Sequence, residues 1–210
     1  MPTQRRARAA TPGRKVKVPK DRLIDAALTL AAEEGWRRLT LAAIAATAGV
    51  PLAETATLFR SKYGIIAAYR RRVDQAVLAG PAPSINDSPR DRLFDVLMRR
   101  FEALKSDRVA LRTIARDSLG DPAMLRLLPG VMSAMGWMLE AAGLPSTGYR
   151  GHFARRAVAA VYLSVLPGFF RDDSSDLGIT MAALDRRLKQ LDSLAGTLAP
   201  ILAGRGRKKD

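Results

Sequence analysis

The 210-residue chain contains no cysteine and only one histidine, and aromatic residues make up 6% of it. Without cysteine, disulfides and thiolate metal sites are excluded, and we expect a reducing, cytoplasmic location. His152 has no obvious serine or aspartate partner in the sequence, and no glycine-rich phosphate loop occurs, so no catalytic residues, cofactor or metal site are predicted. No apolar run is long enough to span a bilayer, so no transmembrane segment is predicted.

Positive charge is abundant and is concentrated at the two ends of the chain. The formal net charge is +15. Residues 1–22 hold eight Lys and Arg against one Asp, a net charge of +7, and residues 205–210 carry +3. Basic tails attract nucleic acid or acidic lipid by releasing counterions. A DNA-binding arm and a merely solubilising tail both fit this pattern.

The apolar pattern predicts helices throughout. Alanine and leucine dominate and no alternating strand pattern occurs, so we predict an all-α chain of about nine helices. The first helix should begin near Lys20 and end at Gly35. Further helices are expected at residues 41–48, 51–59, 62–78, 89–105, 108–119, 122–142, 150–170 and 175–197. Pro129 and Pro167 should kink or break the helices that contain them.

Two short helices joined by a glycine turn are typical of a helix-turn-helix. Thr40 is a good N-cap for the first, Gly49 permits the turn, and Pro51 suits the start of the second. In such a motif the second helix enters the major groove of DNA.

An ordered set of motifs surrounds this turn. They are LIDAAL at 23–28, EGW at 34–36, LTLAAIA at 39–45, AGV at 48–50 and LFRSK at 58–62. Together they resemble the DNA-binding domain of the tetracycline-repressor (TetR) family over residues 23–69. The resemblance implies a basic arm at 1–19, a helix-turn-helix DNA-binding domain with a three-helix core at 20–80, a helical regulatory and dimerisation domain at 88–198, and a basic tail at 199–210.

The resemblance also implies a DNA-contacting set. Phosphate or minor-groove contacts are expected from the arm and from the ends of the short helices. The second short helix supplies the base contacts. The whole set is Arg14, Lys15, Lys17, Lys20, Arg38, Thr40, Pro51, Leu52, Ala53, Glu54, Thr55, Ala56, Thr57, Arg60 and Lys62.

The second short helix, which we call the reading helix, departs from the family's usual pattern at two positions. TetR-type proteins commonly have a small hydroxyl residue where Glu54 stands and a tyrosine where Ala56 stands. A carboxylate is repelled by phosphate, although it can accept a hydrogen bond from cytosine N4. The base contacts left to this helix are Thr55 or Thr57, apolar side chains and Glu54, so we expect weak direct readout.

The C-terminal half is apolar enough to form a ligand cavity or an ordinary core. Its helix around residues 124–139 is apolar on several faces and rich in methionine, which favours an adaptable hydrophobic site. The candidate residues for a small hydrophobic or lipid ligand are Arg112, Arg116, Leu128, Met132, Met135, Trp137 and His152.

The last two helices are the expected homodimer surface. One stripe contains Ala157, Ala160, Val161, Ser164 and Val165, and a second contains Leu184, Leu188, Leu191 and Leu194. A two-fold dimer would present two reading heads to a palindromic site on double-stranded DNA. We therefore predict a TetR-type transcriptional regulator, most simply a repressor.

A second resemblance leaves an alternative open. RDRLFDVLMRRF at 90–101, DDSSDL at 172–177 with Thr180, and LDRRL at 184–188 resemble the lipid-binding accessory proteins of coenzyme Q biosynthesis. Those proteins share the TetR fold, and the resemblance implies lipid binding without sequence-specific DNA binding.

Overall fold

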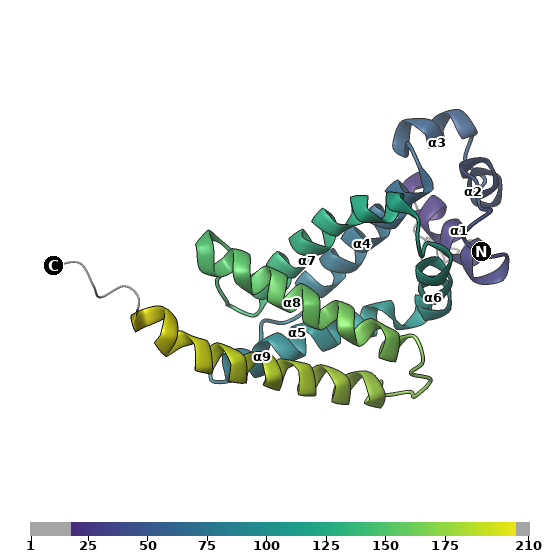
Figure 1. Cartoon of the computed structure of the whole chain (residues 1–210). Helices are drawn as coiled ribbons and strands as arrows, with labels where there is room; N and C mark the ends of the chain where they lie inside the picture. Colours follow the sequence, from purple (N-terminus) through teal and green to yellow (C-terminus); the bar gives the residue numbers. More distant parts are fainter. Residues whose placement is uncertain (1–17, 205–210) are drawn as a thin grey trace, which may run out of the picture.

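The computed structural model describes residues 18–204, and the surroundings of side chains for residues 18–193. Within that range the chain is helical, with nine α-helices, which confirms the all-α prediction (Figure 1). The N-terminal helices are α1 (Pro19–Glu33), α2 (Leu41–Ala48), α3 (Leu52–Leu58) and α4 (Lys62–Leu78). They are followed by α5 (Pro89–Leu104), α6 (Arg108–Asp117), α7 (Leu128–Ala141), α8 (Gly148–Phe169) and α9 (Gly178–Gly204), with 3-10 helices at Lys105–Asp107 and Pro122–Leu127.

Helix α4 joins the N-terminal and C-terminal helices. It packs against α1 on one side and against α5 and α7 on the other. Helix α3 lies at one extreme of the molecule, and the long helices α8 and α9 pack side by side far from it (Figure 1). Helix α6 packs on α1 and so forms a second connection to the N-terminal helices.

Hydroxyl side chains cap the starts of α4 and α5. Ser61 accepts a hydrogen bond from the Gly64 N–H at 3.3 Å, and Ser88 accepts one from the Asp91 N–H at 3.1 Å. These bonds satisfy N–H groups that have no partner inside the helix. The start of α4 therefore lies where the sequence predicts it.

The predicted helix at 122–142 is wrong in its first part. Residues 122–127 form a 3-10 helix, and the α-helix begins at Leu128 with Pro129 in its first turn. A proline in the first turn loses no hydrogen bond, so Pro129 begins the helix where we expected a kink. Pro167 lies inside the last turn of α8, and the helix ends soon after it, at Phe169.

The C-terminal core is built on aromatic contacts and buried methionines. The Phe101 ring lies 5.3 Å from that of Tyr162 and 5.2 Å from that of Phe169, measured between centroids. Met135 and Met138 of α7 are fully buried among these helices. The apolar faces of α7 are therefore largely used in packing.

Buried charge lies where α4 meets α5. The Asp74 carboxylate accepts hydrogen bonds from Arg100, which is only 3% exposed, and from Arg70 at 3.1 Å. The Arg100 guanidinium also lies 5.4 Å from the centre of the Tyr162 ring. A buried guanidinium such as that of Arg100 is strongly destabilising once its carboxylate partner is removed.

A carboxylate also orders the turn between α8 and α9. Asp172 accepts hydrogen bonds from both the N–H and the hydroxyl of Thr180, each at 2.7 Å. Burial alone would raise the pKa of Asp172, but the bonds from Ser174 and Thr180 outweigh it and lower the pKa to about 2. The acidic run at 172–176 thus lies just before the N-terminus of α9, where carboxylates are favourable.

Removing the Asp74 carboxylate should destabilise the fold strongly. Asp74→Ala leaves the Arg100 charge buried without a partner, which we expect to cost about 3 to 5 kcal/mol of unfolding free energy. Urea unfolding measures this cost. Asp185→Ala, which breaks the surface pair with Lys189, is the control and should cost less than about 1 kcal/mol. Equal costs for the two variants would contradict the role assigned to Asp74.

Candidate nucleic-acid interface

Helices α2 and α3 form a tight helix-turn-helix. The Thr40 hydroxyl caps α2 by accepting from the Ala43 N–H at 3.1 Å. Gly49 ends α2 in a left-handed conformation, with φ 59° and ψ 37°, and the chain bends by 114° between the two helices. A bend near this value with a glycine turn of three residues is characteristic of the motif.

Arg22 of α1 holds this turn. Its guanidinium donates to the carbonyl of Ala48 and, at 2.6 Å, to that of Gly49. The turn needs glycine for its left-handed backbone angle, and a Cβ atom at position 49 would lie 2.8 Å from the same guanidinium, whose flexible end would have to shift. From the sequence Arg22 is predicted only as part of the tail charge, because its distance from the turn along the chain leaves no local signal.

Helix α3 is exposed along almost its whole length. Thr55 is the exception, because it is fully buried and its hydroxyl donates to the Pro51 carbonyl at 3.1 Å. The prediction that Thr55 contacts bases is therefore wrong. The other predicted residues of the turn and α3 are exposed, namely Pro51, Leu52, Ala53, Glu54, Ala56 and Thr57.

The Lys62 amine is engaged within the protein. It donates to the carbonyls of Trp36 at 2.8 Å and Arg37 at 3.0 Å, and it lies 5.0 Å from the centre of the Trp36 ring. Desolvation lowers the pKa of this amine. Lys62 therefore anchors the α1–α2 connection and keeps one donor for a phosphate, where we had predicted a simple phosphate contact.

Exposed cations flank the short helices. Lys20, Arg37, Arg38 and Arg60 all have exposed side chains, and the Thr40 cap is exposed as well. The remaining predicted contacts, Arg14, Lys15 and Lys17, lie outside the described residues.

Asp117, at the end of α6, binds the connection between α1 and α2. Its carboxylate accepts from the Trp36 N–H at 2.8 Å and from the Arg37 N–H at 3.4 Å. The first of these bonds contributes most to the lowered pKa of Asp117. Gly35 has a φ of 92° and lets the chain approach, since a Cβ there would lie 3.2 Å from the Asp117 carboxylate.

Asp121 makes a second connection nearby. It accepts a hydrogen bond from the Tyr63 hydroxyl of α4, which is the main reason that its pKa is lowered, and one from the Ala123 N–H at 2.8 Å. Tyr63 packs edge-on against Trp36, with ring centroids 6.0 Å apart. We call residues 35–37, Tyr63, Asp117 and Asp121 the α6 joint. It ties the end of α6 to the frame that carries α3.

The predicted ligand residues do not converge on one site. Met135 is buried in the core, while Arg112 and Arg116 are exposed on α6 and His152 is exposed on α8. Trp137 is 54% exposed and Leu128 43%, and Met132 is partly buried. The structure therefore does not bring these residues together, because Met135 packs in the core while the others lie exposed or partly buried on α6, α7 and α8.

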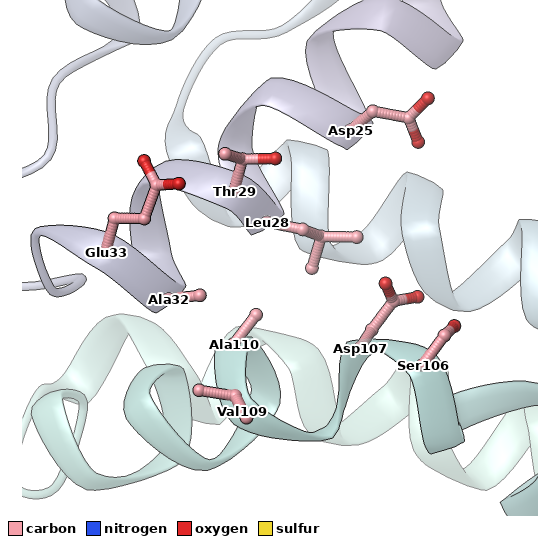
Figure 2. Close-up of a pocket in the computed structure, with 9 residues that line it drawn as sticks. All are labelled: Asp25, Leu28, Thr29, Ala32, Glu33, Ser106, Asp107, Val109 and Ala110. Atoms are coloured by element: carbon pink, nitrogen blue, oxygen red, sulfur yellow. The ribbon is translucent and has the colours of Figure 1, made fainter.

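A hollow of about 440 Å³ lies instead between α1 and α6. Figure 2 shows Ala32 of α1 facing Ala110 of α6 across it. Its lining residues are Asp25, Leu28, Thr29, Ala32, Glu33, Ser106, Asp107, Val109 and Ala110. Two of its carboxylates are engaged, because Arg72 donates to Asp25 and Tyr69 donates to Asp107, each at 2.7 Å.

No single helix within residues 18–204 is long and apolar enough to cross a membrane, although the bent α2–α3 pair passes that test by length and composition. Nor does a group of three or more His, Asp or Glu suited to a metal ion occur in the same part of the chain.

Residues 23–69 match the family model of the bacterial regulatory proteins of the tetR family. A TetR transcriptional regulator from Nitrosomonas europaea ATCC 19718 superposes with a TM-score of 0.66 at 25% identity, covering 81% of this chain and 96% of that one. A TetR regulator from Rhodococcus sp. RHA1 gives 0.62 at 21% identity, covering 82% and 94%. The fatty acid degradation regulator FadR from Bacillus halodurans gives 0.55 at 18% identity, covering 83% and 96%. The latter two show the fold alone. No curated protein matches the chain.

The helix-turn-helix, the family match over residues 23–69 and the superposition at 25% identity support a DNA-binding transcriptional regulator of the TetR type, as the motifs at 23–69 predicted. The resemblance of its C-terminal half to the coenzyme Q accessory proteins stays a prediction.

The α6 joint should govern the environment of Trp36. The chain has two tryptophans, so Trp137→Phe isolates the emission of buried Trp36. In that background, Asp117→Ala should shift the emission to the red and lower the unfolding temperature, because two N–H groups lose their acceptor. Asp87→Ala, at an exposed loop position, is the control. Unchanged emission in the Asp117 variant would contradict the joint.

Acid should weaken the same joint. An aspartate whose folded-state pKa lies below its unfolded value stabilises the fold above that value, and this contribution is lost as pH falls through the folded pKa. For Asp117 and Asp121 the window therefore lies below about pH 4. A variant lacking both carboxylates should lose less stability over that window than the parent does.

Proposed function

We propose that the protein is a homodimeric repressor that binds a palindromic operator and is released from it by a small effector. The observation that carries this proposal is the intact frame of the helix-turn-helix. Arg22 and Gly49 hold the turn, and α3 presents all but one of its side chains to solvent. A frame held in this way serves a protein that places α3 in a groove of DNA.

Affinity for DNA comes from the basic residues around that frame in this proposal. Lys20, Arg38 and Arg60 are exposed, and the exposed N-terminus of α2 offers N–H groups to a phosphate. Arg14, Lys15 and Lys17 of the basic arm add charge that suits the minor groove. Such contacts position the protein on DNA without reading its sequence. Because its target is chromosomal DNA, we also propose a cytoplasmic location.

The exposed face of α8 supports the proposed dimer surface. The two stripes predicted from the sequence pack partly inside one chain, because Val161, Val165, Leu184 and Leu188 are buried. Leu194 lies outside the side chains described. A different stripe is exposed at alternating four- and three-residue spacing, and it consists of Tyr149, Phe153, Arg156, Ala160, Leu163 and Pro167. This spacing is that of a coiled-coil seam, so it favours pairing of α8 with its counterpart in a second copy.

The α6 joint supports regulation by an effector. Asp117 and Asp121 tie α6 and the turn after it to Trp36 and Tyr63. A ligand that prefers a shifted position of α6 would therefore move the frame of α3 and change the distance between the two heads of a dimer. We propose a small hydrophobic effector that acts through this joint, at a site other than Arg112, Arg116 and His152, which do not converge.

Selection of genomic DNA fragments tests the proposed function. The full-length protein is incubated with the fragments at physiological salt and with excess nonspecific competitor. We expect enrichment of a palindromic site, because two α3 helices related by a two-fold axis read two half-sites. Uniform, salt-sensitive recovery of all fragments without an enriched site would show that the basic residues bind DNA without sequence preference. That result would contradict the proposed operator.

Charge on the α8 seam should break the dimer. Leu163→Glu places a carboxylate on each side of the two-fold axis, so we expect the molar mass in light scattering to fall to that of a monomer and operator affinity to fall at least tenfold. Ile85→Glu is the matched control, since Ile85 is 87% exposed in the α4–α5 connection. A Leu163 variant that remains a dimer at the same concentration would place the interface elsewhere.

A further inference from the structure

The outward face of α3 is defined by the one residue of that helix that points inward. Thr55 is buried, and Ala53 and Thr57 stand two positions before and after it, about 160° away around the helix. Both are exposed and lie on one line along the helix, as residues four apart do. Leu52 and Ala56 lie on one side of this line.

No free hydrogen-bond donor remains on this face. The Thr57 hydroxyl donates its proton to the Glu54 carbonyl at 2.7 Å, so its methyl group and an oxygen lone pair remain for contact with DNA. The ionised Glu54 carboxylate only accepts hydrogen bonds. Guanine O6 and N7 need a donor, and adenine needs an amide that both donates and accepts. Helix α3 therefore has no side chain for either contact.

Two features of the major groove fit such a surface, because cytosine N4 can donate to the Glu54 carboxylate and a thymine methyl can contact apolar side chains. Glu54 lies about 100° around the helix from Ala53, so the line through Ala53 and Thr57 offers the apolar contact. The C5-methyl group of thymine is the apolar group presented in the major groove, and alanine and the methyl of threonine contact it. We infer that α3 reads thymine methyl groups, with Ala53 and Thr57 as the specificity-determining residues. Their side chains are about 6 Å apart, close to two base-pair steps of about 3.4 Å, so each half-site should hold two thymines at that spacing.

Charge decides in favour of DNA as the occupant of this apolar face. Lys20, Arg37, Arg38 and Arg60 are exposed around the two short helices, and a second copy of this chain would bring the same cations against them. The phosphates of DNA complement these four cations. The inference rests on the proposed operator binding and adds how the operator is read.

Removal of single methyl groups from the operator tests this readout. The site recovered from genomic DNA is synthesised with deoxyuridine in place of one thymidine at a time, which deletes the methyl and leaves pairing intact. We expect two positions in each half-site at which affinity falls about threefold to fivefold. Replacement at the same position in both half-sites should multiply the effect.

The protein side of the contact has a matched pair of variants. Thr57→Ser removes the methyl group and keeps the hydroxyl, whereas Thr57→Val keeps a methyl at the same branch and removes the hydroxyl. On the thymidine operator, Thr57→Ser should lose about threefold to fivefold and Thr57→Val should stay within twofold of the parent. On the deoxyuridine operator, Thr57→Ser should lose almost nothing further, because the contact is already absent.

The inference and the proposed function fail in different ways. If no site is enriched from genomic DNA, the proposed function fails before any methyl is removed. If a site is enriched but deoxyuridine at every position leaves affinity within twofold, methyl readout is overturned and the operator stands. If methyl loss at both positions of the half-site matters equally for the parent and for Thr57→Ser, neither methyl is read by Thr57, and Thr57 loses its assignment. Sedimentation that shows α3-dependent self-association in place of DNA binding would assign this face to a second copy.

Discussion

The contact between Arg22 and the turn at Gly49 is the constraint on which the rest of the structure depends. A guanidinium from α1 satisfies two carbonyls at the end of α2, where a helix leaves its last carbonyls without partners. It thereby fixes α1 to the turn and sets how α3 leaves it. With that angle fixed, Thr55 points inward and Ala53 and Thr57 point outward. The chemistry available to DNA is a consequence of this one junction.

The same frame is held from the other side by α6. The Lys62 amine donates to the carbonyls of Trp36 and Arg37. The Asp117 carboxylate accepts from the N–H groups of the same two residues. The α1–α2 connection is therefore held between α4 and α6.

Local signals predicted the frame well. Thr40, Gly49 and Ser61 act within a few residues of themselves, so their roles as caps and turn could be inferred from spacing alone. Roles that depend on distant partners were missed or misassigned. Arg22 donates to a turn 26 residues or more along the chain, and Lys62 donates to the main chain at Trp36. Asp117 accepts from the Trp36 N–H, which no local pattern indicates.

The C-terminal half shows the same limit for a different reason. An apolar, methionine-rich helix can line a cavity or fill a core, and composition does not distinguish the two. In the structure Met135 and Met138 are buried, and Trp137 on the same helix is half-exposed. Likewise, the stripe chosen for the dimer contained Val161 and Val165, which pack inside one chain. The face that α8 leaves exposed became visible only once its neighbours α7 and α9 were in place.

The central claim is that sequence preference resides in α3 and that the basic residues supply affinity alone. The most direct test compares the full-length protein with a variant in which Arg14, Lys15 and Lys17 are alanine, on the operator and on a scrambled duplex of equal length and composition. The account predicts that affinity for both duplexes falls by the same factor, so their ratio is unchanged. A ratio that collapses toward one would show that the arm reads the sequence, and it would contradict the account.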